Sequence, residues 1–177
     1  MTTVLGIDIA SRRTGWALIN NGRINKKYLG LINIKYNESM GKRLVAFEIA
    51  LKELIEQYNP DEIVMEDIFK GPNIKTFKIL SLFRGVAIKA IYEITGKDPI
   101  SIMAIQVRKI INITNNKEIV FNTLNDKYKL DFDFKKHNDI VDAIALCLAG
   151  HVMEKQGLSE KDLRSKKKRR KRKKRKK

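Results

Sequence analysis

Two strand-like stretches of the sequence contain acidic residues where a charge is costly. Asp8 interrupts the apolar run TVLGIDIA (residues 3–10), and Glu66 stands near the end of DEIVMEDI (residues 61–68). An unpaired carboxylate in apolar surroundings costs several kcal/mol or takes up a proton, so each needs an arginine or a metal ion beside it. Because side chains alternate along a strand, Glu66 and Asp67 face opposite sides of a sheet. We expect Glu66 to join Asp8, and Asp67 to cap or form a salt bridge at the strand end.

A second pair of acidic residues lies in HNDIVDAIALCLAG (residues 137–150). Asp139 and Asp142 are spaced so that both fall on one face of a helix, in its first turns. Taken singly, Asp139 could favour a helix N-terminus and Asp142 could pair with a lysine. Small residues further along would let this helix lie close to a sheet: Ala143, Ala145 and Ala149. Its two carboxylates would then approach Asp8 and Glu66.

Four carboxylates in one pocket repel one another, and without cations some of them would be protonated. Hard oxygen ligands of this kind suit Mg²⁺, with Mn²⁺ as a substitute, and no Cys/His cluster indicates zinc. Two such ions roughly 3.5–4 Å apart form a clamp that activates water and stabilises the leaving oxygen of a phosphodiester. The spacing predicts metal-dependent phosphodiester hydrolysis, against the alternative that each acid is a cap or a solvated charge.

The charge of the chain indicates a polyanionic partner. There are 37 Lys and Arg against 20 Asp and Glu, a formal net charge of +17, and residues 166–177 are all basic. Without that run and Arg164, the remaining 24 basic and 20 acidic residues leave a body charge of only +4. A mildly basic body with a polycationic tail favours nucleic acid as the partner.

Cysteine content and hydropathy bound the compartment. A single cysteine, Cys147, excludes an internal disulfide framework. Neither a secretory signal nor an apolar run of membrane-spanning length is visible. We therefore expect a soluble intracellular protein without membrane association. It would be cytoplasmic in a bacterial or phage host, or at a nuclear or viral replication site if the basic tail is a localisation signal.

The hydrophobic periodicity predicts an α/β fold in which three strands come first and helices then alternate with the two remaining strands before a helical C-terminal part. Strands are expected at 3–10, 14–20, 26–34, 61–68 and 99–105. Helices are expected at 41–58, 73–96, 105–112, 115–127 and 138–154, with a polar connection at 127–136. The first three strands form an antiparallel meander, and crossover helices make the last two parallel. This gives a mixed five-stranded sheet flanked by helices in a domain of residues 1–154, followed by a disordered basic tail at 155–177.

Taken together, these segments resemble the RuvC-type Holliday junction resolvases, a family with the ribonuclease H-like fold. GIDIASRRTGWALI resembles the first strand and hairpin of the family, and IVMEDIF its glutamate strand. NIKTFKILSLFRGVAI resembles its helix with an Arg-Gly pair, and HNDIVDAIALCLAG its closing acidic helix. The likeness spans residues 4 to about 150. One departure is Ile9-Ala10, where the family has Pro-Gly; it alters a turn and leaves the carboxylate in place.

The resemblance implies residue roles. The catalytic, metal-binding carboxylates would hold two Mg²⁺ ions per active site: Asp8, Glu66, Asp139 and Asp142. Residues near DNA would be Phe69, Arg84, Arg108 and Lys117. Phe69 would lie near the junction centre, unless it is an ordinary core residue. Arg108 and Lys117 would lie near the scissile phosphate, unless they are simply solvated.

The resemblance also implies an assembly and a product. A homodimer would nick opposing strands of a four-way DNA junction, leaving 5′-phosphate and 3′-hydroxyl ends, with no small-molecule cofactor. The helix at 73–96 would supply the dimer contact, unless its apolar face is buried in the core.

Three other functions compete with this one. A different ribonuclease H-like nuclease would act on branched replication DNA or structured RNA. A non-catalytic nucleic-acid binder could keep the fold, although four acidic positions argue against it. A sugar kinase with a similar first strand would need a second domain of comparable size, for which we expect this chain to be too short.

The basic tail leads to a first prediction. Its leading residues are expected to bind phosphates without sequence preference: Lys166, Lys167, Lys168, Arg169 and Arg170. Deleting residues 165–177 should weaken DNA binding, because contacts with phosphates are lost. Each lost contact should also reduce the magnitude of the slope of log K against log salt concentration by about 0.9. Cleavage chemistry should be unchanged. Binding titrations at several salt concentrations measure the slope, and an unchanged slope would refute the assignment.

Overall fold

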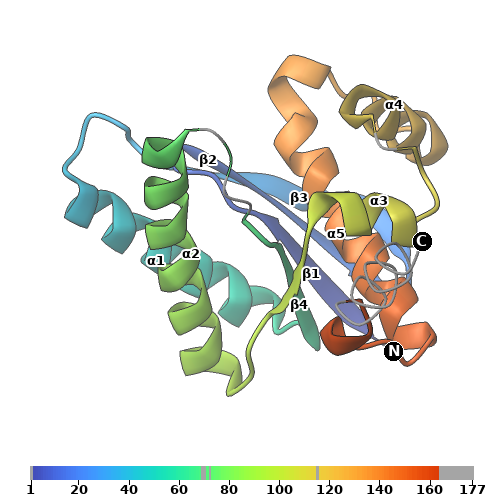
Figure 1. Ribbon diagram of the computed structural model, residues 1–177, viewed down its shortest axis with the longest axis horizontal. Helices are drawn as coiled ribbons and strands as arrows, with labels where there is room; N and C mark the ends of the chain where they lie inside the picture. The colour runs from blue at the N-terminus through green and yellow to red at the C-terminus, as the bar shows by residue number, and fades with distance from the viewer. Residues whose placement is uncertain (1, 69–70, 72, 115, 164–177) are drawn as a thin grey trace, which may run out of the picture.

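A five-stranded sheet in the order β3-β2-β1-β4-β5 forms the centre of the computed structural model, which describes residues 2–68, 71, 73–114 and 116–163 (Figure 1). Its strands are β1 (Thr3–Asp8), β2 (Arg13–Asn20), β3 (Arg23–Asn33), β4 (Glu62–Glu66) and β5 (Ile100–Ile102). β2 pairs antiparallel with β1 and β3, whereas β4 pairs parallel with β1 and β5. The predicted mixed sheet is confirmed.

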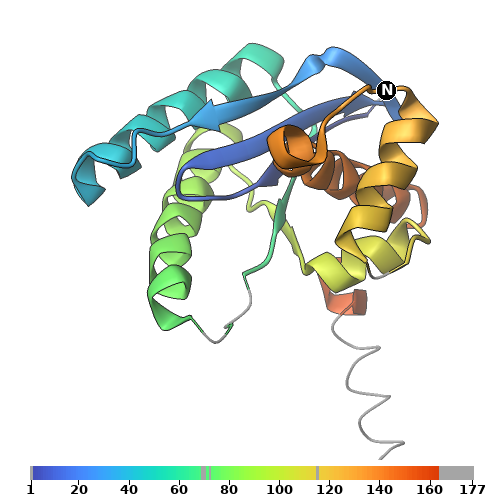
Figure 2. The same cartoon turned by 90° about the horizontal axis from the view of Figure 1, so that it is seen from above.

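Helices cover both faces of this sheet. α1 (Met40–Tyr58) and α2 (Ile74–Thr95) lie on one face. α3 (Ala104–Ile110), α4 (Lys117–Tyr128) and α5 (Phe134–Lys155) lie on the other, as Figure 2 shows from above. Because β1 is covered on both sides, its residues alternate between two cores: Val4 packs with α5, and Leu5 with α1 and α2. This alternation explains the almost continuous apolar run of the first strand.

Several element boundaries differ from the sequence-based expectation; β5, for example, is only Ile100–Ile102 where 99–105 was expected, and two other differences have a clear local cause. β3 begins at Arg23 rather than at residue 26, because Asn21 and Gly22 both take positive φ and form a two-residue turn. α5 begins at Phe134 rather than at 138, because the Asp133 side chain accepts a hydrogen bond from the backbone N–H of Lys136 and caps the helix there. Asp139 therefore lies in the second turn of α5, and the expected polar connection is shorter.

α5 lies directly against β1 and β2 because glycines face it. A Cβ added to Gly6 would overlap the carbonyl oxygen of Ala143, and one added to Gly15 would overlap that of Asp139. The Cys147 thiol fits the same seam and donates to the carbonyl oxygens of Val4 and Ala17, at 3.3 and 3.0 Å. The expected close approach of this helix to the sheet is present, and glycines of the strands permit it. Of the small helix residues expected there, Ala143, Ala145 and Ala149 are all buried, and Ala145 lines a pocket beside α3 and α4.

The chain after α5 returns to the domain. Leu158 and Leu163 pack against the core on the α5 side, and the Glu160 carboxylate accepts a hydrogen bond from the backbone N–H of Ser101 in β5. Packing against the core therefore continues beyond residue 154 within the described residues. In the stretches that the structure describes, no helix has the length and apolar character to cross a membrane.

The contact at Gly15 gives a prediction for stability. Gly15→Ala should destabilise the protein by about 1–3 kcal/mol or more, because the new methyl group must displace the backbone of α5. Gly41→Ala is the matched control: Gly41 lies in the first turn of α1 with nothing within 4 Å of the added Cβ. That variant should be neutral or stabilised by up to about 1 kcal/mol. Urea unfolding compares them, and equal effects would contradict the close approach of α5.

Candidate active site

Two of the predicted carboxylates lie at the same edge of the sheet and on the same face. Asp8 ends β1 and Glu66 ends the neighbouring parallel strand β4. The register pairs Ile7 with Met65, so Asp8 and Glu66 occupy the next position of each strand. Both alternate onto the face that packs against α5. In open α/β sheets, ligands bind in the crevice outside the carboxyl ends of the strands, and these two acids stand there.

Asp67 turns to the opposite face. Its carboxylate pairs with the guanidinium of Arg84 on α2 at 3.1 Å. Arg84 also donates to the Ser101 hydroxyl at 2.9 Å, which ties α2 to the ends of β4 and β5. The choice of Glu66 over Asp67 for the shared face, and the expected salt bridge of Asp67, agree with this geometry.

α5 brings the other two acids to Asp8. Asp8 pairs in register with Gly15, and the backbone of Asp139 lies directly over Gly15. Asp142 lies one turn further along the same helix, beside Glu66 in a shared pocket. Both side chains are largely covered, with 18% of Asp139 and 19% of Asp142 exposed. The tertiary structure thus gathers four carboxylates from three elements.

Burial and mutual repulsion raise the pKa of Asp8, Glu66 and Asp142. Burial is the largest cause for Asp8, Glu66 and Asp142 alike. The negative charges of Asp142 and Glu66 raise the pKa of Asp8 further, and that of Asp142 raises the pKa of Glu66. Such crowding favours protons or cations at the site.

Basic side chains neutralise part of the negative charge of the acids. The Lys117 ammonium, at the start of α4, lies 2.6 Å from Asp142 Oδ2, and Arg13 Nε donates to Asp139 Oδ2 at 2.7 Å. Burial acts to lower the pKa of Lys117, but the hydrogen bond to Asp142 raises it, and the net shift is upward. The lysine therefore stays charged. Neither cation is buried, since 44% of Lys117 and 35% of Arg13 remain exposed. Each occupies one oxygen of its carboxylate.

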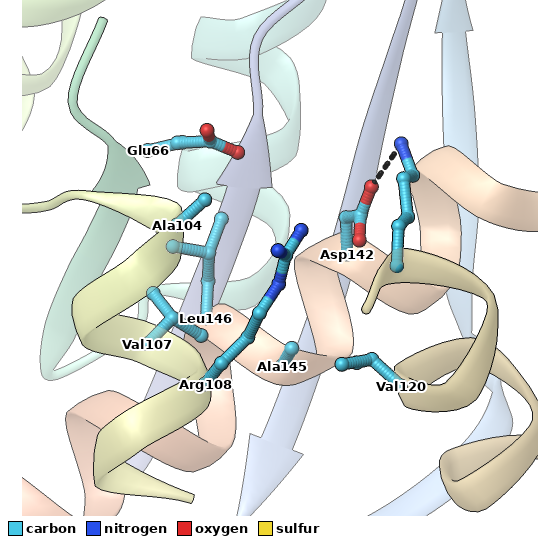
Figure 3. Close-up of a pocket in the computed structure, with 9 residues that line it drawn as sticks. Glu66, Ala104, Val107, Arg108, Val120, Asp142, Ala145 and Leu146 are labelled. Atoms are coloured by element: carbon cyan, nitrogen blue, oxygen red, sulfur yellow. Dashed lines mark ion pairs between the residues drawn. The ribbon is translucent and has the colours of Figure 1, made fainter. Parts of the chain in front are cut away.

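A pocket opens between β4, α3, α4 and α5. Figure 3 shows Glu66 and Asp142 on its two sides, with the Arg108 guanidinium pointing from α3 into the space between them and the ion pair of Asp142 with Lys117 dashed. Apolar side chains complete the lining, among them Val107 and Leu146. The positive charge of Arg108 lowers the pKa of both Glu66 and Asp142. Such a mixture suits a phosphate group beside an apolar sugar surface.

Comparison with known proteins settles the family. A family profile described as crossover junction endodeoxyribonuclease RuvC matches residues 4–150. The chain belongs to the RuvC family. The RuvC of Dictyoglomus thermophilum is 29% identical over 159 residues, which cover 87% of this chain and 98% of that protein. The RuvC of a Wolbachia strain is 37% identical over 98 residues, covering 54% of this chain and 60% of that protein.

Solved structures share the fold. T. thermophilus RuvC in complex with a Holliday junction substrate has a TM-score of 0.77 at 16% identity, covering 90% of this chain and 98% of that chain. The yeast mitochondrial Holliday junction resolvase has a TM-score of 0.56 at 15% identity, covering 88% and 80%. These likenesses confirm the ribonuclease H-like fold expected from the sequence.

The RuvC family depends on divalent metal ions, and the donor set of this chain fits them. Four carboxylates supply only hard oxygen ligands, and burial followed by mutual repulsion raises the pKa of three of them, Asp8, Glu66 and Asp142. In the described part of the chain, however, no three His, Cys, Asp or Glu side chains are gathered tightly enough to hold an ion as they stand. Lys117 and Arg13 each hold one of the acids. Side-chain rotations would have to bring the acids together around an ion.

The other predicted RuvC residues have different outcomes. Arg108 and Lys117 line the acidic pocket, whereas Arg84 is only 16% exposed and is held by Asp67 and Ser101. The predicted contact of Arg84 with DNA stays a prediction. Several expected DNA-binding residues lie outside the described residues: Phe69, Lys166, Lys167, Lys168, Arg169 and Arg170.

Sequence reasoning missed two residues that shape this RuvC site. Arg13 falls between the expected strands at 3–10 and 14–20, and Gly15 lies inside the second of them, with no role predicted for either. Gly15 had a signal, since a glycine inside a strand often marks a close approach of another backbone. Arg13 had none, because its partner Asp139 is 126 positions away.

The crowding of the acids gives a second stability prediction. Because the folded protein raises the pKa of Asp8, ionising this group costs stability as pH rises above the ordinary aspartate value, and the cost is complete above the raised pKa. Asp8→Asn removes that cost and keeps the shape of the side chain. Without divalent metal at neutral pH, this variant should unfold at a higher temperature than the wild type.

The difference should shrink toward about pH 4, where the carboxyl group is protonated more fully in both folded and unfolded chains. Thermal unfolding followed by circular dichroism across this range measures both temperatures. A variant that is less stable than the wild type at neutral pH would contradict the repulsion.

Proposed function

We propose that this protein is a divalent-metal-dependent endonuclease that resolves four-way DNA junctions by paired phosphodiester hydrolysis. One observation supports this above all: four acids from β1, β4 and α5 lie near one another at the carboxyl ends of β1 and β4, beside basic residues from α3 and α4. Family membership agrees with it, since the relatives are named crossover junction endodeoxyribonucleases and a structural neighbour is described in complex with a Holliday junction.

The four carboxylates would hold the metal: Asp8, Glu66, Asp139 and Asp142. Two Mg²⁺ ions would supply a deprotonated water and stabilise the leaving oxygen, and Mn²⁺ would substitute for Mg²⁺. Asp8 and Glu66 come from rigid strand ends, so they would fix where the reacting phosphate sits. Asp139 and Asp142 would follow the position of α5 against the sheet. The products would carry 5′-phosphate and 3′-hydroxyl ends.

Lys117 and Arg108 would orient the scissile phosphate. Both line the pocket beside Glu66 and Asp142, and their charges suit an oxyanion within it. The Lys117 ammonium has a half-exposed side chain, so it can leave Asp142 as cation and phosphate enter. Arg108 approaches from α3, opposite Lys117 on α4, and the two would bracket the phosphate.

The working unit would be a homodimer. A four-way junction has two equivalent strands to cut, and a twofold-symmetric enzyme presents one site to each. Large apolar side chains are exposed on the two helices of the far face, Val45 and Ile49 on α1 and Leu82 and Tyr92 on α2. They offer a surface for the second copy, in line with the expectation that the helix at 73–96 supplies the contact. The basic tail would add contacts to the junction arms.

A cleavage assay with a synthetic four-way junction and Mg²⁺ tests the function. We expect symmetrically placed nicks in opposing strands with the wild type. Asp142→Asn should slow cutting by at least about 10²-fold and keep junction binding, because it removes a metal ligand and leaves the basic surfaces intact. Asp126→Asn, the same chemical change at an exposed position of α4, is the matched control and should cut normally.

A substrate panel distinguishes the alternatives. Three-way DNA and structured RNA should be cut more slowly than the four-way junction. Faster cutting of either would assign the protein to another ribonuclease H-like activity. Binding without cutting under every divalent metal would favour a non-catalytic nucleic-acid binder.

A further inference from the structure

We propose that Arg13 is a positioning residue that orients Asp139 for metal binding. The inference rests on the proposed function, because it takes Asp139 as a metal ligand. Arg13 does not line the pocket between Glu66 and Asp142. It acts through the carboxylate that it holds.

The Arg13 guanidinium makes three hydrogen bonds to the first turns of α5. Nε donates to Asp139 Oδ2 at 2.7 Å, and one terminal nitrogen lies 3.3 Å from Asn138 Oδ1 and 3.4 Å from the carbonyl oxygen of Lys135. The planar, rigid fork of an arginine makes such multiple contacts specific in geometry. A lysine at this position would keep the charge and lose the fork.

The base of this arginine is fixed. Arg13 begins β2 and pairs with Asn33 of β3. The next residue, Thr14, is fully buried, and its hydroxyl group exchanges hydrogen bonds with the backbone of Ala10 at 3.0 and 3.1 Å. The residue after that, Gly15, packs directly against the backbone of Asp139. The side chain and the backbone of Asp139 are therefore both positioned by β2, the strand that pairs with the Asp8-bearing strand β1.

The contact leaves a coordination position on the carboxylate. Arg13 occupies Oδ2 of Asp139, and a single metal–oxygen bond needs only the other oxygen. Carboxylates that ligate metals are commonly held by hydrogen bonds of this kind, and losing such a partner typically costs about 10–100-fold in metal affinity or activity. The arginine would thus select one orientation of Asp139 before the ion arrives.

Arg13 differs in this respect from Lys117. Lys117 contacts Asp142 through one flexible ammonium group, and that ion pair competes with a metal for the carboxylate. Arg13 would also repel a cation, but its half-exposed side chain lies where water screens charge. Orientation should therefore outweigh repulsion, and removing Arg13 should weaken metal binding instead of strengthening it.

The test is titration of the full-length, DNA-free protein with Mn²⁺, followed by calorimetry and by electron paramagnetic resonance of free Mn²⁺. Arg13→Gln should weaken binding by about 10-fold, and Arg13→Lys should weaken it as well. Arg12→Gln is the matched control, because it removes the same charge from the neighbouring residue. Arg12 is exposed, and its guanidinium carbon lies 4.5 Å from the centroid of the Tyr36 ring. This variant should bind Mn²⁺ like the wild type.

A double variant separates positioning from a general loss of structure. In an Asp139→Asn background, the Arg13→Gln change should have little further effect on Mn²⁺ affinity, because the side chain that it orients no longer ligates. Additive losses would overturn the proposal, as would unchanged or tighter Mn²⁺ binding by Arg13→Gln, or wild-type binding by Arg13→Lys. Should Arg13→Gln fail to fold, Arg13→Lys decides between these outcomes.

The same titration keeps the two levels apart. Failure of the wild type to bind Mn²⁺ or to cut any junction would count against the proposed function itself. Wild-type binding and cutting with no change in Arg13→Gln would remove only the role of Arg13.

Discussion

The close approach of α5 to β1 and β2 is the contact on which the site depends. A helix can approach a sheet only as far as the intervening side chains allow, and here Gly6 and Gly15 present none. The helix backbone therefore rests on the strand that ends in Asp8 and on that strand's partner. A thicker layer between them would carry Asp139 and Asp142 away from the strand-end acids. The four carboxylates would then be separate surface charges.

That approach has an electrostatic consequence. Acids gathered at a half-covered edge raise one another's pKa, so the arrangement opposes the stability of the fold. Lys117 and Arg13 offset part of the repulsion, each through one carboxylate oxygen. Functional sites commonly give up stability in this way, because a group that is ready to bind a cation is poorly compensated without it.

The far face of the sheet supports the same edge from behind. On α1, Arg43 donates to the carbonyl oxygen of Ser11 in the turn after β1 and lies over the ring of Phe83. On α2, Arg84 holds Asp67, directly after Glu66. Two arginines from the layer opposite α5 thus fix the chain just beyond each acid-bearing strand. Precision at the site depends on both layers, although only one of them contributes to the pocket.

Much of this could be predicted from local patterns. Alternation and periodicity predict the elements and the mixed sheet, because apolar residues must face a core whatever their partners. The same alternation separates Glu66 from Asp67, since neighbouring strand residues face opposite ways. Acids in apolar surroundings mark the candidate site because their burial is costly wherever it occurs. Boundaries were less certain where a single side chain decides them, as the Asp133 cap does for α5.

Other features were decided by the tertiary structure alone. Arg13 meets Asp139, and Lys117 meets Asp142, across distances in sequence that no local pattern reports. Whether Arg84 faces the protein or the solvent depends on Asp67 and Ser101, which belong to other elements. The sequence by itself thus determined which residue types are present and which face each strand residue takes, because those follow from chain geometry. Which cation holds which acid depended on how the layers dock, because a charge interacts with whatever the fold places beside it.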